Sequence, residues 1–134
     1  MVMVSPRHPL AKLAAVSVEE IAQHPLIFPK TGYTRQLLDK LFRPYREQLR
    51  VTMELPSVGM IKNFVSAGLG ATLISSSFVQ AEAASHQVTL IPLKGVDLWR
   101  ELGLIYRKDR SLPRAAQAFI TLVRQRTAPL AARS

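Results

Sequence analysis

The stretch FVSAGLGATLISSSFV, residues 64–79, passes from the apolar face of a predicted helix to an apolar strand through two glycines, Gly68 and Gly70. A phosphate-binding loop carries its glycines after a strand and before a helix, because the helix N-terminus must point at the anion. Here that order is inverted. We therefore predict that Gly68 is the left-handed residue that ends the helix, and that Gly70 allows a close backbone approach at the start of the strand.

Outward from this corner, predicted strands and helices alternate along the chain. Strands are expected at VMVSP (2–6), PLIFP (25–29), LRVTMEL (49–55), GATLIS (70–75), VTLIPL (88–93) and RELGLIYRK (100–108). Helices are expected near residues 17–23, 34–44, 57–67, 77–84 and 111–126, where apolar residues recur every three or four positions. This alternation predicts one α/β domain with a mostly parallel sheet of about five strands flanked by helices.

Two of these helices begin with an explicit capping signal. Ser17 and Glu20 have the spacing of a capping box, in which each side chain accepts a hydrogen bond from the other residue's backbone N–H. Ser57 can cap the helix that leads to Gly68.

Composition excludes several kinds of site. Cysteine is absent, which excludes disulfides, thiolate nucleophiles and zinc ribbons.

The formal charge is +9, and residues 100–134 hold eight basic and two acidic residues, a net +6. No aromatic residues interleave with this charge, so we expect a solvated basic surface more than a nucleic-acid interface. No apolar run reaches the roughly 18–20 residues of a membrane span and no signal peptide is visible, so we expect a cytoplasmic protein without membrane contact.

Catalytic constellations are not evident in the sequence. The histidines His8, His24 and His86 are scattered, without metal-ligand spacing or a partner nucleophile. Glu54 lies near the carboxyl end of a predicted strand and could face a cleft, but a lone carboxylate lacks the second group that acid–base catalysis needs. We therefore expect no enzyme activity, no cofactor and no metal.

Hydroxyl side chains gather where helices are predicted to start. In open α/β sheets, ligands bind outside the carboxyl ends of the strands, and the following helices begin there. Hydroxyls fall at three such positions: Thr31 and Thr34, then Ser57, then serines 75–77. Lys30 and Arg35 flank the first of them. Backbone N–H groups, helix dipoles and hydroxyls together suit a small anion such as a carboxylate or sulfate.

Five consecutive segments resemble the effector-binding region of LysR-type transcriptional regulators: SPRHPLAK, SVEEIAQHPLIF, TRQLLDKLF, SVGMIKNFVSAGLGATLISSSFV and RELGLIYRKDRSLPRAAQAFITLV. The resemblance implies a fold similar to type II periplasmic binding proteins, in which two α/β lobes joined by two crossover strands hold the effector between them. Residues 1–106 would be mostly the second lobe, with VMVSP and LGLIYR as the crossover strands. Residues 107–134 would be a C-terminal helix that returns to the first lobe, followed by a frayed tail.

The resemblance also implies a function: the regulator would sense a small anionic metabolite and thereby control transcription. The ligand-binding residues would be Thr31, Gly32, Tyr33, Thr34, Pro56 and Ser57. A homodimer would use the helix near residues 34–43 and the strand at 49–55. DNA would be contacted only through an N-terminal helix-turn-helix domain, which is not visible in this sequence, so we expect a truncated fragment.

Two further expectations follow from a fragment of this kind. A cleft with one wall buries little of a small ligand, so the isolated chain would bind its effector weakly or undetectably. The apolar stripe of the last helix would also be exposed: Leu112, Ala115, Ala116, Phe119, Ile120 and Val123. The alternative to a regulator is a free-standing periplasmic-type solute-binding protein, which would need a signal peptide.

Overall fold

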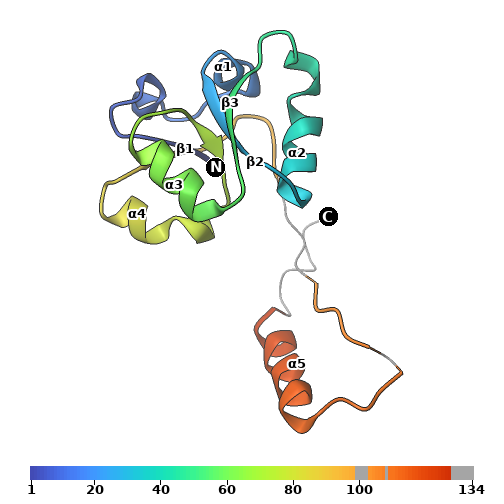
Figure 1. Ribbon diagram of the computed structural model, residues 1–134. Helices are drawn as coiled ribbons and strands as arrows, with labels where there is room; N and C mark the ends of the chain where they lie inside the picture. The colour runs from blue at the N-terminus through green and yellow to red at the C-terminus, as the bar shows by residue number, and fades with distance from the viewer. Residues whose placement is uncertain (99–102, 108, 128–134) are drawn as a thin grey trace. The chain divides into compact units, whose positions relative to one another are not determined.

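The computed structural model describes residues 1–98, 103–107 and 109–127. The chain divides into two compact units, Met1–Trp99 and Arg100–Ser134. The first unit, which we call the lobe, holds most of the regular structure, and the second carries a single helix within its described part (Figure 1). The boundary predicted at residue 106 from the resemblance stays a prediction.

Strands and helices alternate along the lobe as the sequence predicts. The elements are β1 (Val2–Val4), α1 (Val18–Ala22), β2 (Pro25–Pro29), α2 (Tyr33–Leu41), β3 (Arg50–Leu55), α3 (Val58–Ser66), β4 (Thr72–Leu73), α4 (Gln80–Ala84) and β5 (Thr89–Ile91). Short 3₁₀ turns at Pro9–Lys12, Arg43–Tyr45 and Ser76–Phe78 connect some of them, and α5 (Arg114–Thr127) belongs to the second unit. The α/β fold class is therefore confirmed.

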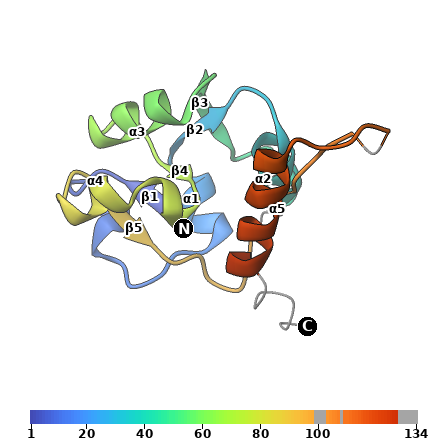
Figure 2. The ribbon, with the colours of Figure 1, turned by 90° about the horizontal axis from the view of Figure 1, so that it is seen from below.

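The strands of the lobe run mostly in one direction. β1 lies between β4 and β5 and is antiparallel to both, as Figure 2 shows, so β4 and β5 share a direction. β2 and β3 pair in parallel, and a parallel bridge between Leu26 and Ala71 joins β2 to the start of β4. The predicted common direction is thus confirmed for four of the five described strands, which form two sheets, β4-β1-β5 and β2-β3, joined by this bridge. β1 is the exception, because strand direction depends on long-range pairing that local sequence does not encode.

The last predicted strand is wrong in the part that the structure describes. Residues 103–107 of the segment LGLIYR have no regular secondary structure, and Ile105 is 98% exposed. A strand needs a neighbouring strand for its backbone hydrogen bonds. β1, the other predicted crossover strand, is already paired along both sides by β4 and β5.

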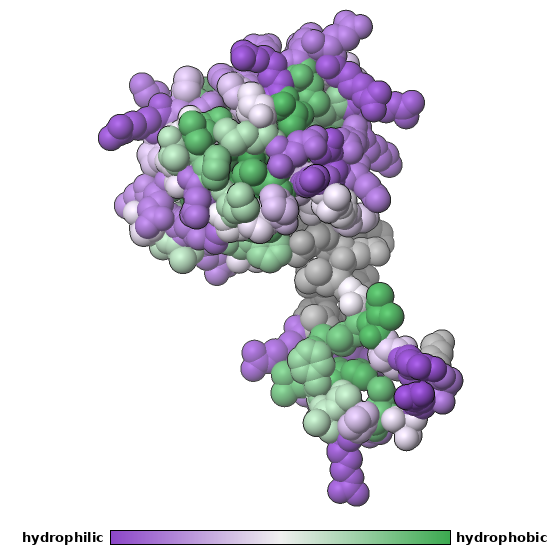
Figure 3. Space-filling view, in the orientation of Figure 1, coloured by the Kyte–Doolittle hydropathy of each residue, from purple (hydrophilic) through white to green (hydrophobic). Residues whose placement is uncertain are grey.

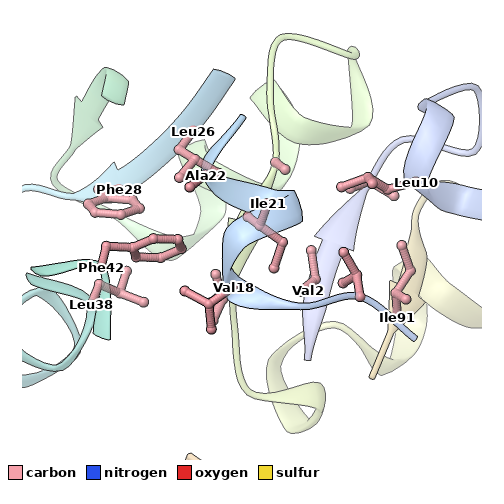
Figure 4. Close-up of a cluster of buried hydrophobic side chains, with 14 residues drawn as sticks. Val2, Leu10, Val18, Ile21, Ala22, Leu26, Phe28, Leu38, Phe42 and Ile91 are labelled. Carbon is pink, nitrogen blue, oxygen red and sulfur yellow. The ribbon is translucent and has the colours of Figure 1, made fainter. Parts of the chain in front are cut away.

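Helices cover both faces of the sheet because side chains alternate along each strand. On one face, α1 and α2 pack Ile21, Leu38 and Phe42 against strand residues that include Val2 and Phe28 (Figure 4). The rings of Phe28 and Phe42 lie 5.6 Å apart, centroid to centroid. On the other face, Ile61 and Val65 of α3 pack in a second cluster against the alternate strand positions Met3 and Ile27, together with Val79 and Val88. Because apolar side chains are buried on both faces of the sheet, the packing of each helix sets the position of its first residue relative to the end of the preceding strand.

The two glycines of the opening stretch have the predicted roles. Gly68 follows the C-cap of α3 with φ +83°, a conformation that side chains rarely adopt. At Gly70, an added Cβ would lie 2.8 Å from the carbonyl oxygen of Pro25. The backbones of Gly70 and β2 therefore approach too closely for any larger residue, and this contact brings β4 beside β2.

The second unit exposes part of the predicted apolar stripe. Phe119 of α5 is 58% exposed and Ala115 is exposed, whereas the other four stripe residues are half-buried. Figure 3 shows apolar surface on this unit. The predicted frayed tail is residues 127–134. Thr127 is the last residue of α5, and residues 128–134 lie outside the described residues. None of the helices that the structure describes is long and apolar enough to cross a lipid bilayer.

Candidate functional site

Two strand ends and two helix starts meet at one edge of the sheet. β2 and β3 end together, since Pro29 is paired with Leu55. The N–H of Lys30 donates to the carbonyl oxygen of Leu55 at 2.9 Å, so the loops that follow the two strands leave side by side. These loops lead directly into α2 and α3. We call this border, at which β2, β3 and β4 end, the carboxyl edge.

The start of α3 is capped by its own side chain. Ser57 has extended backbone angles, and its Oγ accepts the Met60 N–H at 3.2 Å. This confirms the cap expected from the sequence. Because a hydroxyl has one donor hydrogen besides its lone pairs, Ser57 keeps that hydrogen for another group while it caps the helix.

The start of α2 has no such cap. Its N-cap residue is Gly32, with φ 96° and ψ 179°, and no side chain accepts a hydrogen bond from the first turn. Among the described residues, the backbone N–H groups of Tyr33, Thr34 and Arg35 have no acceptor. The positive end of the helix dipole and three unpaired donors therefore face outward at this point.

The six residues predicted to bind ligand all lie in these two loops and first turns. Thr31, Gly32, Tyr33, Pro56 and Ser57 are exposed, and Thr34 is half-buried. The hydroxyls of Thr31 and Thr34 make no hydrogen bond to any residue that the structure describes. None of the six is sealed beneath packed side chains.

The Arg35 side chain is less available to a ligand than its sequence position suggests, because it is paired within the protein. Its Nε lies 2.9 Å from Asp39 Oδ1, and its Nη1 lies 2.6 Å from Glu54 Oε1. The guanidinium also stands 5.7 Å from the Phe28 ring centroid. The hydrogen bond to Glu54 raises the pKa of the Arg35 guanidinium, partial burial opposes that change, and Asp39 adds to it. Arg35 therefore ties α2 to β3, and two carboxylates balance its charge.

Lys30 is the cation that remains. Its side chain is exposed, and it forms no ion pair with the described part of the chain. The serines that follow β4 belong to the same edge, but the Ser75 and Ser77 hydroxyls lie 2.9 Å apart and bond to each other. The carboxyl edge thus offers unpaired N–H donors, two unpaired threonine hydroxyls and one available ammonium group.

Residues for chemistry are not assembled at this edge. Glu54, the one carboxylate that sequence reasoning placed near a cleft, is held by Arg35. Among the residues that the structure describes, no group of three or more His, Asp or Glu side chains is placed to hold a metal ion. An α/β lobe with open donors at the carboxyl ends of its strands is typical of ligand-binding lobes.

Comparison with known proteins then gives the family. The model of the LysR substrate binding domain matches residues 1–128. The chain belongs to this family. The match covers the whole lobe and all of α5.

Relatives in sequence are transcriptional regulators. The chain is 31% identical over 121 residues to the HTH-type transcriptional activator CmpR of Synechocystis sp., which covers 90% of this chain and 40% of that protein. It is 28% identical over 120 residues to the RuBisCO operon transcriptional regulator of Allochromatium vinosum, covering 89% of this chain and 40% of the relative. The chain therefore spans less than half the length of these relatives.

Solved structures confirm the type II periplasmic-binding-like fold. The regulatory domain of Synechocystis CcmR, in complex with 2-PG, superposes with a TM-score of 0.75 at 21% identity, over 96% of this chain and 62% of that one. The effector binding domain of QuiR, in complex with shikimate, gives a TM-score of 0.70 at 23% identity, over 93% of this chain and 59% of that one.

Proposed function

We propose that this chain is the effector-binding region of a LysR-type transcriptional regulator, and that the carboxyl edge of its lobe binds the anionic group of a small metabolite. The uncapped start of α2 carries the proposal. Helix N-termini with unpaired N–H groups are natural anion sites, because the donors and the dipole act on the same charge.

The predicted ligand-binding residues have distinct roles in this proposal. The N–H groups of Tyr33 and Thr34 hold the anion, and Lys30 adds a charge. The Thr31 hydroxyl donates a further hydrogen bond. From the neighbouring loop, Ser57 donates its hydroxyl hydrogen while its oxygen stays on Met60. Pro56 and the Tyr33 ring give apolar surface beside the polar groups, as small-molecule sites usually have.

The comparisons support a regulator over a free-standing solute-binding protein. The relatives above are transcriptional regulators, and each is more than twice as long as the matched segment. The ligands bound to the neighbouring structures, 2-PG and shikimate, are small molecules. We propose that DNA contact is made by another part of the full-length regulator, which acts in the cytoplasm as a homodimer. The free edge of β3 and the exposed side of α2 are the surfaces the lobe offers to a second copy.

Effector control follows if the ligand binds one arrangement of the regulator more tightly than another. The lobe contributes binding without a chemical step, since the two carboxylates described near the site, Glu54 and Asp39, are both paired with Arg35. We therefore propose a non-enzymatic role.

The proposal is tested by ligand-observed NMR on the 134-residue chain with 2-PG and shikimate as probes, at constant ionic strength. The matched variants are Lys30→Gln, at the start of α2, and Lys40→Gln, in its last turn. We expect Lys30→Gln to weaken binding of one probe by about fivefold, the effect of about 1 kcal/mol, while Lys40→Gln leaves it unchanged. Equal effects of the two variants on the affinity for a bound probe would overturn the assignment of the site.

A further inference from the structure

A polar cavity lies at the edge of the sheet opposite the carboxyl edge. Because β1 runs against the other strands, the chain leaves β1 at the far edge and enters the loop 5–9 there. The end of α3 and the residues before β5 reach the same place. Between these three segments lies a cavity of about 470 Å³. We call it the distal pocket.

The lining of the distal pocket is polar and basic. Arg7, His8 and His86 contribute to it, and none of its lining residues is acidic. Arg7 is exposed and forms no ion pair with any described residue. His8 Nδ1 accepts the Leu10 N–H at 3.2 Å, so the proton of the neutral ring lies on Nε2. Burial lowers the pKa of His8 and the neighbouring His24 lowers it further, so His8 is a neutral N–H donor at pH 7.

A hydroxyl without a hydrogen-bond partner among the described residues also opens onto this pocket. Ser5 is only 7% exposed and lines the cavity, yet its Oγ has no hydrogen bond to the described part of the protein. The hydroxyl faces Gly68, where an added Cβ would lie 3.7 Å from it. Because this oxygen is open to the cavity, its hydroxyl hydrogen is available to a group bound there.

His86 occupies the position after the C-cap of α4, where glycine, which has no side chain, is the usual residue. It follows the C-cap of α4 with φ 55°, the left-handed conformation in which glycine is the favoured residue. A histidine there is strained relative to glycine. Its imidazole lines the distal pocket.

We infer that the distal pocket is a second small-molecule site, which binds the oxyanion group of a small organic acid or phosphate ester. The Ser5 hydroxyl, His8 and Arg7 supply donors and charge from one loop, and His86 supplies a donor from the opposite wall. The volume falls within the range of small-molecule sites and exceeds what a single inorganic ion fills. This site shares no residue with the carboxyl edge, so it does not depend on the function proposed above.

The test is an amide chemical-shift titration of the 134-residue chain with inorganic phosphate and, separately, with acetate, each at an ionic strength held constant with sodium chloride. The two arms distinguish a phosphate from a carboxylate group. We expect saturable shifts at residues 5–9, 66–68 and 86–87 with at least one anion. No saturable shift in these segments with either anion overturns the inference.

Three variants separate a built site from general attraction to a basic protein. Arg7→Gln should weaken binding by about fivefold, while Arg46→Gln, which removes the same charge at an exposed position elsewhere on the lobe, should change it less than twofold. His86→Gly should weaken binding while the melting temperature stays the same or rises, because the backbone strain is relieved. Equal effects of Arg7→Gln and Arg46→Gln, or unaltered binding in His86→Gly, contradict the inference.

Discussion

The two helices that begin at the carboxyl edge solve the same problem in opposite ways. α3 covers its first turn with the Ser57 hydroxyl, which accepts the Met60 N–H. α2 starts from Gly32, which has no side chain to offer and takes a backbone conformation, φ 96° and ψ 179°, that almost only glycine adopts. At the start of α3, a side chain of the protein accepts a backbone N–H. At the start of α2, the N–H groups are available to an acceptor from outside the chain.

This difference indicates where stability and binding are separated in the lobe. A cap at α3 contributes to folding whether or not a ligand is present. An uncapped α2 gives up that contribution, and keeps three N–H groups free for an anion. Changes at the two starts should therefore have different consequences for stability and for binding.

The largest expected effect is at Gly32. Gly32→Ala meets no atom within 4 Å of its Cβ, so any loss comes from the backbone angles alone. We expect a loss of about 1–3 kcal/mol in the free energy of unfolding, measured by urea denaturation. The matched control is Gly59→Ala in the first turn of α3, where the space is also open and φ is ordinary. It should be neutral or stabilising by up to about 1 kcal/mol. Similar losses in both variants would mean that the Gly32 conformation is not what matters.

The next effect is at Ser57. Ser57→Ala leaves the Met60 N–H without its acceptor, and we expect a loss of about 1 kcal/mol in the free energy of unfolding. Ser57→Asp should retain stability, because a carboxylate caps equally well and suits the helix dipole. If the alanine and aspartate variants unfold at the same urea concentration, the cap is not a source of stability.

Arg35 ties α2 to β3, and its replacement should have a smaller effect on the free energy of unfolding. Arg35→Gln removes the ion pairs with Glu54 and Asp39, which are largely open to solvent, so about 0.5–1 kcal/mol of stability is expected to be lost. Arg43→Gln is the control, since Arg43 is exposed and unpaired within the described residues. A smaller loss in Arg35→Gln than in Arg43→Gln would contradict the proposed tie between α2 and β3.

The smallest change in stability is expected at Thr31. Its side chain is exposed, so Thr31→Val should shift the free energy of unfolding by less than about 0.5 kcal/mol. Binding of the anion should nevertheless weaken, because the variant keeps the shape and loses the donor. Loss of stability without loss of binding would reverse the roles assigned to the two helix starts.

Local spacing in the sequence was enough to predict the features that depend on neighbouring residues. The capping box of Ser17 and Glu20, the Ser57 cap, and the corner at Gly68 and Gly70 all have their expected geometry. Each arises from contacts within a few residues or from a steric limit that only glycine meets.

Features set by pairing between distant segments were missed. The Arg35–Glu54 ion pair joins residues 19 positions apart and exists because α2 packs beside the end of β3. The i,i+4 spacing of Arg35 and Asp39 was a visible sign that this cation had a partner. The distal pocket combines three segments that meet only because β1 runs antiparallel, and the same pairing leaves no side of β1 for the strand predicted near residue 105.

The central claim is that the backbone N–H groups at the start of α2, and not those at the start of α3, receive an anion. The most direct measurement is an amide chemical-shift titration of the 134-residue chain with 2-PG, in which the N–H signals of Tyr33, Thr34 and Arg35 are compared with that of Met60. The account predicts saturable shifts at the three α2 amides, with Met60 moving little because Ser57 already occupies its N–H. Shifts centred on Met60, or no saturable shift at α2, would contradict it.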